Sequence, residues 1–265
     1  MVKYKEYDNS GGNMEHNKIN IRGILFDNIT LGESEALIED ILLREPGSAC
    51  PVYTPNAEIA QACIEDAALM EIINSAELVL PDGVGVIKAA KILGTPLKAK
   101  VAGVEFGELA LKVAAKMGKK VFFCGGKPSV AEEAAKKMCE KYEGLIICGT
   151  NDGYFKKTGE ESDSVVEKIN ASGADVLFVC LGFPTQERWI NDNRSALKTV
   201  NICLALGGSL DVYAGNVQRA PDIFIKLGLE WFYRLLKEPK RLGRMMKLPK
   251  YLFGTYSHKL KRKRN

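Results

Sequence analysis

The chain has 265 residues, of which 46% are hydrophobic and 26% charged, enough to bury one sizeable core without a second full domain. No stretch approaches the roughly 18 consecutive apolar residues of a membrane-spanning helix, and the polar start lacks the apolar region of a secretory signal, so we expect a cytosolic protein. The net charge of +4 is unevenly spread, because residues 232–265 hold 12 Lys or Arg against Glu238 alone, which leaves −7 for the rest. A basic tail of +11 favours a polyanionic partner, either anionic lipid headgroups or nucleic acid.

Apolar runs alternate with helical patterns along most of the chain. We expect residues 1–17 to be disordered, a first strand at 19–26 and a first helix at 33–44. Further strands are predicted at 52–54, 78–80, 120–124, 145–148, 176–181 and 200–206, and further helices at 56–68, 83–93, 104–117, 128–142, 160–170 and 185–196. This rhythm predicts an α/β fold with a doubly wound, largely parallel, Rossmann-like sheet over residues 18–220. Residues 221–265 form a predicted C-terminal basic amphipathic helical appendage.

Two polar loops follow neighbouring predicted strands. Thr54 and Asn56 come directly after the strand at 52–54, and Asp82 follows the strand at 78–80. Ligands of open α/β sheets bind outside the carboxyl ends of the strands, so these side chains are candidates to converge on one substrate. The alternative is structural, because Asp82 before a Gly-Val-Gly-Val helix start is a natural N-cap, and Thr54 and Asn56 also suit turns and caps.

Three more strand ends carry glycine-rich or polar loops. Gly125 and Gly126 sit where a backbone can approach a phosphate or ribose, or where a tight strand-to-helix turn needs glycine. This loop is not a Walker A sequence, and the chain has no GxGxxG fingerprint, which argues against an NAD-dependent oxidoreductase. The other two loops bring further hydrogen-bonding groups to helix starts, namely Gln186, Glu187 and Asp211.

These blocks together resemble the WecG/TagA/CpsF family of bacterial glycosyltransferases over residues 19–251. The resemblance rests on Thr54-Pro55-Asn56, Pro81-Asp82-Gly83, Val101-Ala102-Gly103, Gly182-Phe183-Pro184 with Gln186-Glu187, Gly207-Gly208 with Asp211, Arg219-Ala220-Pro221, and Gly228-Leu229-Glu230-Trp231 running into Arg234. TagA-like members transfer N-acetylmannosamine, with inversion, from its UDP donor to GlcNAc-diphospho-undecaprenol in wall teichoic acid linkage-unit synthesis. The resemblance therefore implies a transferase on the inner face of the plasma membrane, and it implies that copies can self-associate.

The residues fit that reaction. In an inverting transfer a carboxylate removes a proton from the acceptor hydroxyl, and Asp82 is the candidate base, with Thr54 beside it. We expect Asn56 to hold substrate hydroxyls, Gly125 and Gly126 to contact the donor, and Gln186, Glu187 and Asp211 to contact the nucleotide or donor sugar. Lys100 stands where the family usually has arginine, which weakens the expectation of a bidentate substrate contact there.

No metal or other cofactor is expected. The chain has no DxD pair, and its only histidines, His16 and His258, lie in the two tails. The resemblance implies that arginines of the appendage meet the charge of the departing diphosphate instead, and the matching positions are Arg234, Arg241 and Arg244.

The sequence is also compatible with other functions. Relatives with a similar core use other UDP-sugars, including UDP-N-acetylmannosaminuronic acid and UDP-glucose. A function of another class is non-catalytic binding of a nucleotide or polyanion through the basic tail. A nucleic-acid partner is not expected, because no aromatic-interleaved basic surface or nucleic-acid module is present on the body.

Overall fold

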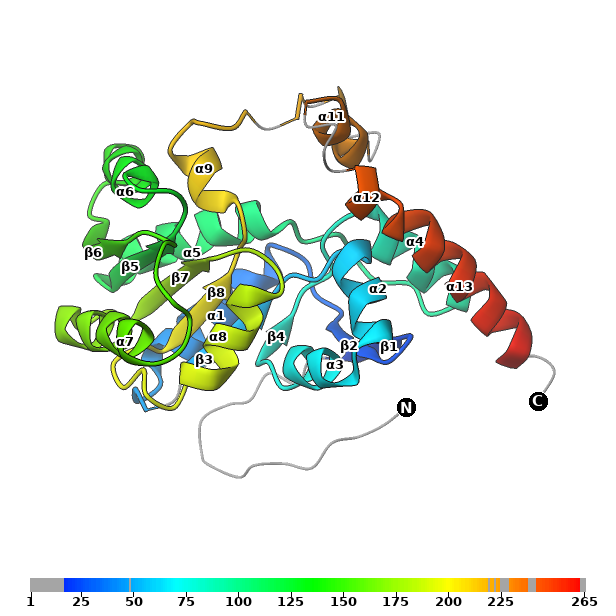
Figure 1. Ribbon diagram of the computed structural model, residues 1–265, viewed down its shortest axis with the longest axis horizontal. Coiled ribbons are helices and arrows are strands. Elements are labelled where there is room, and N and C mark those ends of the chain that lie inside the picture. Colours follow the sequence, from blue (N-terminus) through cyan, green and yellow to red (C-terminus); the bar gives the residue numbers. More distant parts are fainter. Residues whose placement is uncertain are drawn as a thin grey trace.

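A six-stranded parallel sheet forms the centre of the computed structural model, which describes residues 17–47, 49–218, 220–221, 223–224, 229–237 and 242–262 (Figure 1). Its strand order is β4-β3-β8-β7-β5-β6, and every pairing is parallel. The strands are β3 (Cys50–Tyr53), β4 (Leu78–Val79), β5 (Lys120–Gly125), β6 (Ile146–Asn151), β7 (Val176–Cys180) and β8 (Ile202–Ala205). The predicted α/β, Rossmann-like fold is confirmed.

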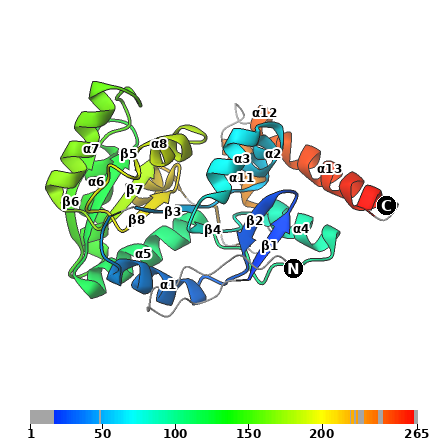
Figure 2. The same cartoon turned by 90° about the horizontal axis from the view of Figure 1, so that it is seen from below.

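Helices cover both faces of this sheet (Figure 2). One apolar cluster takes side chains from α1 (Glu33–Leu43), α5 (Gly103–Met117), α6 (Val130–Lys141) and α9 (Ser209–Tyr213). The other takes side chains from α2 (Ala57–Glu65), α3 (Ala67–Asn74), α4 (Val84–Leu93), α7 (Glu160–Ser172) and α8 (Thr185–Asn193). Because helices lie on both sides, the central strands are apolar at successive positions rather than at alternate ones.

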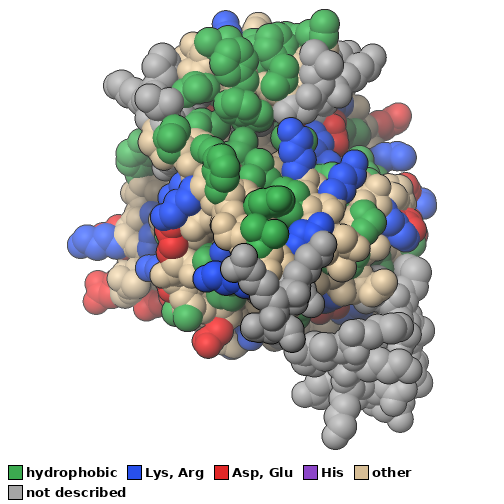
Figure 3. All heavy atoms as spheres, turned by 90° about the vertical axis from the view of Figure 1, so that its right-hand side faces the viewer, with side chains coloured by type: hydrophobic (Ala, Val, Ile, Leu, Met, Phe, Trp, Pro, Cys, Tyr) green, Lys and Arg blue, Asp and Glu red, His purple; other side chains and the backbone are tan. Residues whose placement is uncertain are grey.

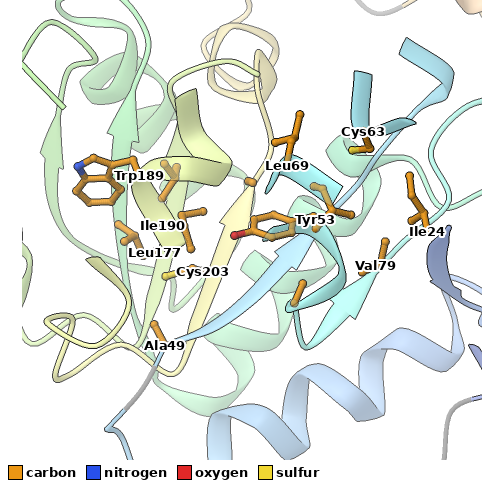
Figure 4. Close-up of a cluster of buried hydrophobic side chains, with 14 of the residues drawn as sticks. Ile24, Ala49, Tyr53, Cys63, Leu69, Val79, Leu177, Trp189, Ile190 and Cys203 are labelled. Carbon is orange, nitrogen blue, oxygen red and sulfur yellow. The ribbon is translucent and has the colours of Figure 1, made fainter. Parts of the chain in front are cut away.

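Large side chains fill the second cluster (Figure 4). Tyr53 of β3 lies in it near Cys203 of β8 and Ile190 of α8, and Trp189 is almost fully buried. The Tyr53 hydroxyl donates to the backbone carbonyl of Glu187 at 3.3 Å, and the Trp189 indole donates to Ser162 Oγ at 2.9 Å. The first bond fixes the first turn of α8, which holds two of the predicted site residues, against the end of β3, and the second ties α8 to α7.

The C-terminal segment forms α11 (Glu230–Lys237), α12 (Leu242–Met245) and α13 (Lys247–Arg262). Helix α13 packs along α2 and α4 and adds the fully buried Tyr251 to the core (Figure 1). Lys250 pairs with Glu65 of α2 at 2.6 Å. The division at residues 220 and 221 stays a prediction, but α13 contributes to the same apolar cluster as the sheet.

Two predicted elements differ in the structure, and two helices were not predicted. The strand predicted at 19–26 is a two-stranded antiparallel hairpin, β1 (Lys18–Ile21) and β2 (Ile24–Asp27), which turns at Arg22 and Gly23, both with positive φ. The helix predicted at 56–68 ends at Glu65, because Asp66 is extended and its side chain caps α3 at Leu69. Helices α3 and α9 were not predicted.

The predicted disordered segment 1–17 lies outside the described residues except for Asn17. Among the helices that the structure describes, none combines the length and the apolar content needed to cross a bilayer.

Candidate functional site

Thr54 and Asp82 lie at the same edge of the sheet, because β3 and β4 are adjacent parallel strands that both end there. Backbone bonds join the two loops: Leu80 N–H donates to Tyr53 O at 2.8 Å, and Asp82 N–H donates to Pro55 O at 3.4 Å. The two predicted loops therefore lie side by side, and their convergence on one substrate stays a prediction.

Gly103, at the start of α5, brings the two side chains together. Its N–H donates to Asp82 Oδ2 at 3.4 Å, and a Cβ at this position would stand only 2.8 Å from Thr54 Oγ1. The preceding Val101 N–H donates to Pro81 O at 2.9 Å, so the chain segment leading into α5 is tied to the Asp82 loop. The positive end of the α5 dipole therefore faces the Asp82 carboxylate.

The cap alternatives for the two loops have different outcomes. Helix α4 begins at Val84 with Gly83 at its cap position, so Asp82 is not the N-cap residue of α4; its carboxylate instead accepts from the N–H of Gly103, the first residue of α5. Asn56 is the N-cap of α2, and its Oδ1 accepts from the N–H groups of Glu58 at 2.9 Å and Ile59 at 3.1 Å. The cap role of Asn56 is confirmed, and its substrate contact stays a prediction.

Gln186 and Glu187 are both buried in the first turn of α8. Gln186 Oε1 accepts from Gly207 N–H at 3.0 Å, and Gln186 Nε2 donates to Glu187 Oε1 at 3.0 Å. Glu187 Oε2 is buried and has no hydrogen-bond partner among the described residues. Burial raises the pKa of the Glu187 carboxyl to about 7. These two residues join the loop after β8 to the site, and their contact with the donor stays a prediction.

The Gly125-Gly126 loop follows β5 on the other side of the sheet centre. Both glycines have positive φ, and a Cβ at Gly125 would clash with the Cys180 carbonyl oxygen. The structural need for glycine is therefore confirmed at Gly125, where β5 and β7 approach closely. Donor contact by this loop stays a prediction.

One exposed aromatic residue near this loop was missed from the sequence. Gly153 N–H donates to Gly126 O at 2.8 Å, and the adjacent Tyr154 is 70% exposed. The turn is held by Asp152, whose carboxylate accepts from Tyr154 N–H at 2.7 Å, and by Lys157, which donates to Gly153 O at 2.8 Å. An Asp-Gly-Tyr sequence directly after a strand was the available signal.

The remaining predicted residues are on α9, on the segment before α5 and on the C-terminal helices. Asp211 is half-buried in α9, just past the end of β8. Lys100 Nζ forms an ion pair with Glu230 Oε2 of α11 at 2.7 Å. Arg234 and Arg244 belong to α11 and α12, but their side chains, like the whole of Arg241, lie outside the described residues.

The predicted residues thus form two groups along one edge. Thr54, Asp82 and Asn56 gather at β3 and β4, with Gln186 beside them at β8. Gly125 ends β5 and Gly126 follows it, and β5 is three strand positions from β3, about 14 Å at the usual spacing of parallel strands. Within the part of the chain that the structure describes, no three His, Cys, Asp or Glu side chains are grouped as metal ligands.

Comparison with known proteins gives one family. The sequence profile of the glycosyl transferase WecG/TagA/CpsF family matches residues 19–265. The chain is 38% identical over 207 residues to the N-acetylglucosaminyldiphosphoundecaprenol N-acetyl-beta-D-mannosaminyltransferase of Bacillus spizizenii, covering 78% of this chain and 79% of that protein. It is 33% identical over 247 residues to the protein of the same name from Staphylococcus aureus (strain MW2), covering 93% and 95% of the two chains.

Proposed function

This chain belongs to the WecG/TagA/CpsF family of glycosyltransferases, and on that premise we propose that it transfers N-acetylmannosamine from UDP-N-acetylmannosamine to GlcNAc-diphospho-undecaprenol. The product would be the linkage unit of wall teichoic acid, formed with inversion at the sugar. The observation that carries the proposal is the contact of Gly103 with both Asp82 and Thr54 at the open edge of the sheet.

Asp82 acts as the general base in this proposal. Its carboxylate takes the proton of the acceptor hydroxyl while that oxygen forms a bond to the anomeric carbon of the donor sugar. The bond between that carbon and the diphosphate oxygen breaks, and UDP leaves from the opposite face with the electron pair. The Gly103 N–H at the start of α5 orients the Asp82 carboxylate, and Thr54 Oγ1, packed against Gly103, holds a sugar hydroxyl beside it.

The donor lies along the edge of the sheet, with its sugar near β3 and β4. The distance of about 14 Å from β3 to β5 suits an extended nucleoside diphosphate, so the uridine lies near Gly126 and Tyr154. A Tyr154 ring that is mostly exposed offers a face on which the base can stack. Replacing Tyr154 by Ala should raise the KM for the donor about 10-fold and change kcat much less. An unchanged donor KM would remove Tyr154 from the site.

Arginines meet the charge of the departing diphosphate, because a guanidinium group donates to phosphate oxygens in a bidentate manner. The candidates are Arg234, Arg241 and Arg244 of the C-terminal segment. Turnover should therefore persist in EDTA, and loss of turnover in EDTA that returns with a divalent cation would contradict this assignment.

The C-terminal segment also holds the enzyme on the inner face of the plasma membrane. Its exposed apolar side chains include Phe232, Leu236, Met246, Phe253, Tyr256 and Leu260. Figure 3 views this side of the molecule, where apolar side chains lie beside Lys and Arg side chains. Apolar contact combined with basic charge is the pattern of proteins that bind reversibly to anionic lipid surfaces, and a membrane-bound acceptor requires such contact.

The deciding experiment measures release of UDP from UDP-N-acetylmannosamine with the lipid-linked acceptor, in EDTA, for the wild type and for Asp82→Asn. We expect acceptor-dependent turnover in the wild type and a loss of about 10²- to 10⁴-fold in the variant. Turnover with UDP-glucose or UDP-N-acetylmannosaminuronic acid alone would keep the transferase and change the donor. Binding of UDP without turnover of any donor would favour the non-catalytic alternative.

A further inference from the structure

One ion pair connects α11 to the body of the protein beside the proposed base. Glu230, the first residue of α11, places Oε2 2.7 Å from Lys100 Nζ. Their side chains are 24% and 21% exposed, whereas the nearby surface pair Lys98–Glu33 is 49% and 47% exposed. Water and salt screen a shielded pair less, so the Lys100–Glu230 pair contributes more to holding its two elements together.

Lys100 is well placed to anchor a helix at the site. The next residue, Val101, donates its N–H to Pro81 O at 2.9 Å, and Asp82 follows Pro81 directly. Lys100 therefore stands on a segment tied to the Asp82 loop. Figure 1 shows α11 beside α12, away from the central sheet. In sequence Arg234 follows Glu230 by four positions, which is about one turn of α11.

We propose that the Lys100–Glu230 pair docks α11 next to Asp82, and that Lys100 is a positioning residue rather than a ligand of the substrate diphosphate. The inference rests on the proposed transferase function, in which the arginines of this segment meet the diphosphate. Pairing with Glu230 compensates the positive charge of Lys100 and so weakens its attraction for a phosphate. The same pair fixes the position of the start of α11 relative to the base. Direct diphosphate binding by Lys100 is the competing role, and it makes a different prediction.

Charge exchange separates the two roles. In the full chain we compare Lys100→Glu, Glu230→Lys and the double variant that carries both. Docking predicts that each single variant lowers kcat/KM about 10-fold or more, because two like charges then face each other, and that the double variant returns to within about 3-fold of the wild type. If Lys100 binds diphosphate, the double variant stays as low as Lys100→Glu, which would overturn the proposal.

The matched control is the exposed pair Lys98–Glu33, which lies two residues earlier in the chain. Lys98→Glu and Glu33→Lys should each change kcat/KM by less than about 3-fold, since exposed pairs contribute little. Equal losses of kcat/KM for the variants of both pairs would mean that any charge reversal in this region lowers activity, and would contradict docking of α11.

Amide hydrogen exchange of residues 230–237 provides a readout that does not depend on turnover. We expect faster exchange in both single variants and wild-type exchange in the double variant, while residues 120–125 of the central sheet stay unchanged. Unchanged exchange of α11 in Glu230→Lys would refute docking even if activity falls. Absence of turnover in the wild type would instead refute the transferase function, and the exchange data would still decide whether the pair docks the helix.

Discussion

The Glu187 carboxyl accepts a hydrogen bond from Gln186, whose Nε2 lies 3.0 Å from Glu187 Oε1. The orientation of the Gln186 amide follows from its other contact, because the Gly207 backbone N–H can only donate and so must face the oxygen. A neutral amide neighbour does not compensate an ionised carboxylate in a buried position. Burial therefore favours the uncharged form of the Glu187 carboxyl and raises its pKa to about 7.

Glu187→Gln should change how stability depends on pH. Because burial raises the pKa of Glu187 from 4.5 to about 7, the folded protein binds more protons than the unfolded chain in that window, so stability falls as pH rises through it. The variant does not lose stability in this way. The difference in the free energy of unfolding between variant and wild type should therefore shift by roughly 2 kcal/mol in favour of the variant from pH 5 to pH 8. Urea unfolding at both pH values measures it. The exposed Glu71→Gln serves as control, and parallel pH dependences of wild type and Glu187→Gln would contradict the assignment.

Gly103→Ala should reduce activity strongly. Its Cβ would lie 2.8 Å from Thr54 Oγ1, too close for real atoms, so either Thr54 or the start of α5 must move away from Asp82. We expect kcat/KM to fall about 100-fold, as for other displacements near 1 Å in a catalytic site, with about 1–3 kcal/mol lost in stability. Steady-state kinetics and urea unfolding measure the two effects. Gly47→Ala is the control, since its Cβ meets nothing within 4 Å, and full activity of Gly103→Ala would rule out the close contact.

Gly85→Ala tests the packing of α13 on α4. The added methyl would lie 2.5 Å from Leu248 Cδ1 and 2.7 Å from Ala57 Cβ, so we expect a loss of about 1–3 kcal/mol in the free energy of unfolding. Adding Leu248→Ala removes the first clash and leaves the second, so recovery should be incomplete. Thermal and urea unfolding of the two variants measure this, and equal stability of wild type and Gly85→Ala would show that α13 does not pack there.

Phe253→Ser tests membrane contact without disturbing the core. A point substitution is preferable to removing the C-terminal segment, because α13 contributes the buried Tyr251. Phe253 is 76% exposed on α13, and losing its burial in lipid should weaken co-sedimentation with anionic vesicles about 10-fold or more. Leu43→Ser is the matched control, since Leu43 is 75% exposed on α1. Equal binding of both variants and the wild type would remove α13 from the membrane-binding surface.

The central sheet could be predicted because its strands are continuous apolar runs separated by helical patterns. The errors in the predicted elements come from single residues. The composition of the sequence does not reveal the backbone conformation of these residues. Arg22 adopts positive φ, which is uncommon for a side chain of this kind, and so the turn of the first hairpin was not predicted. Asp66 ends one helix and caps the next, although the apolar periodicity continues past it.

The parts of the candidate site that lie at strand ends could be predicted from the sequence. The parts that depend on contacts between residues far apart in the sequence could not. Adjacent parallel strands necessarily bring Thr54 and Asp82 to one edge. Lys100 and Glu230, however, are separated by 130 positions, and no local pattern indicates that they meet. The burial of Glu187 is equally invisible in the sequence, because a polar residue at a helix start is usually exposed.

The packing of α13 has a consequence for synthesis of the protein. Lys250 of α13 and its partner Glu65 of α2 are separated by 185 positions, so α2 and α4 leave the ribosome long before the helix that packs against them exists. Until then the apolar face that later receives Tyr251 and Leu248 is open to solvent and to chaperones. The helices beside Thr54 and Asp82 therefore gain their final support only late in translation, and a nascent chain that already contains both residues is not yet a finished enzyme.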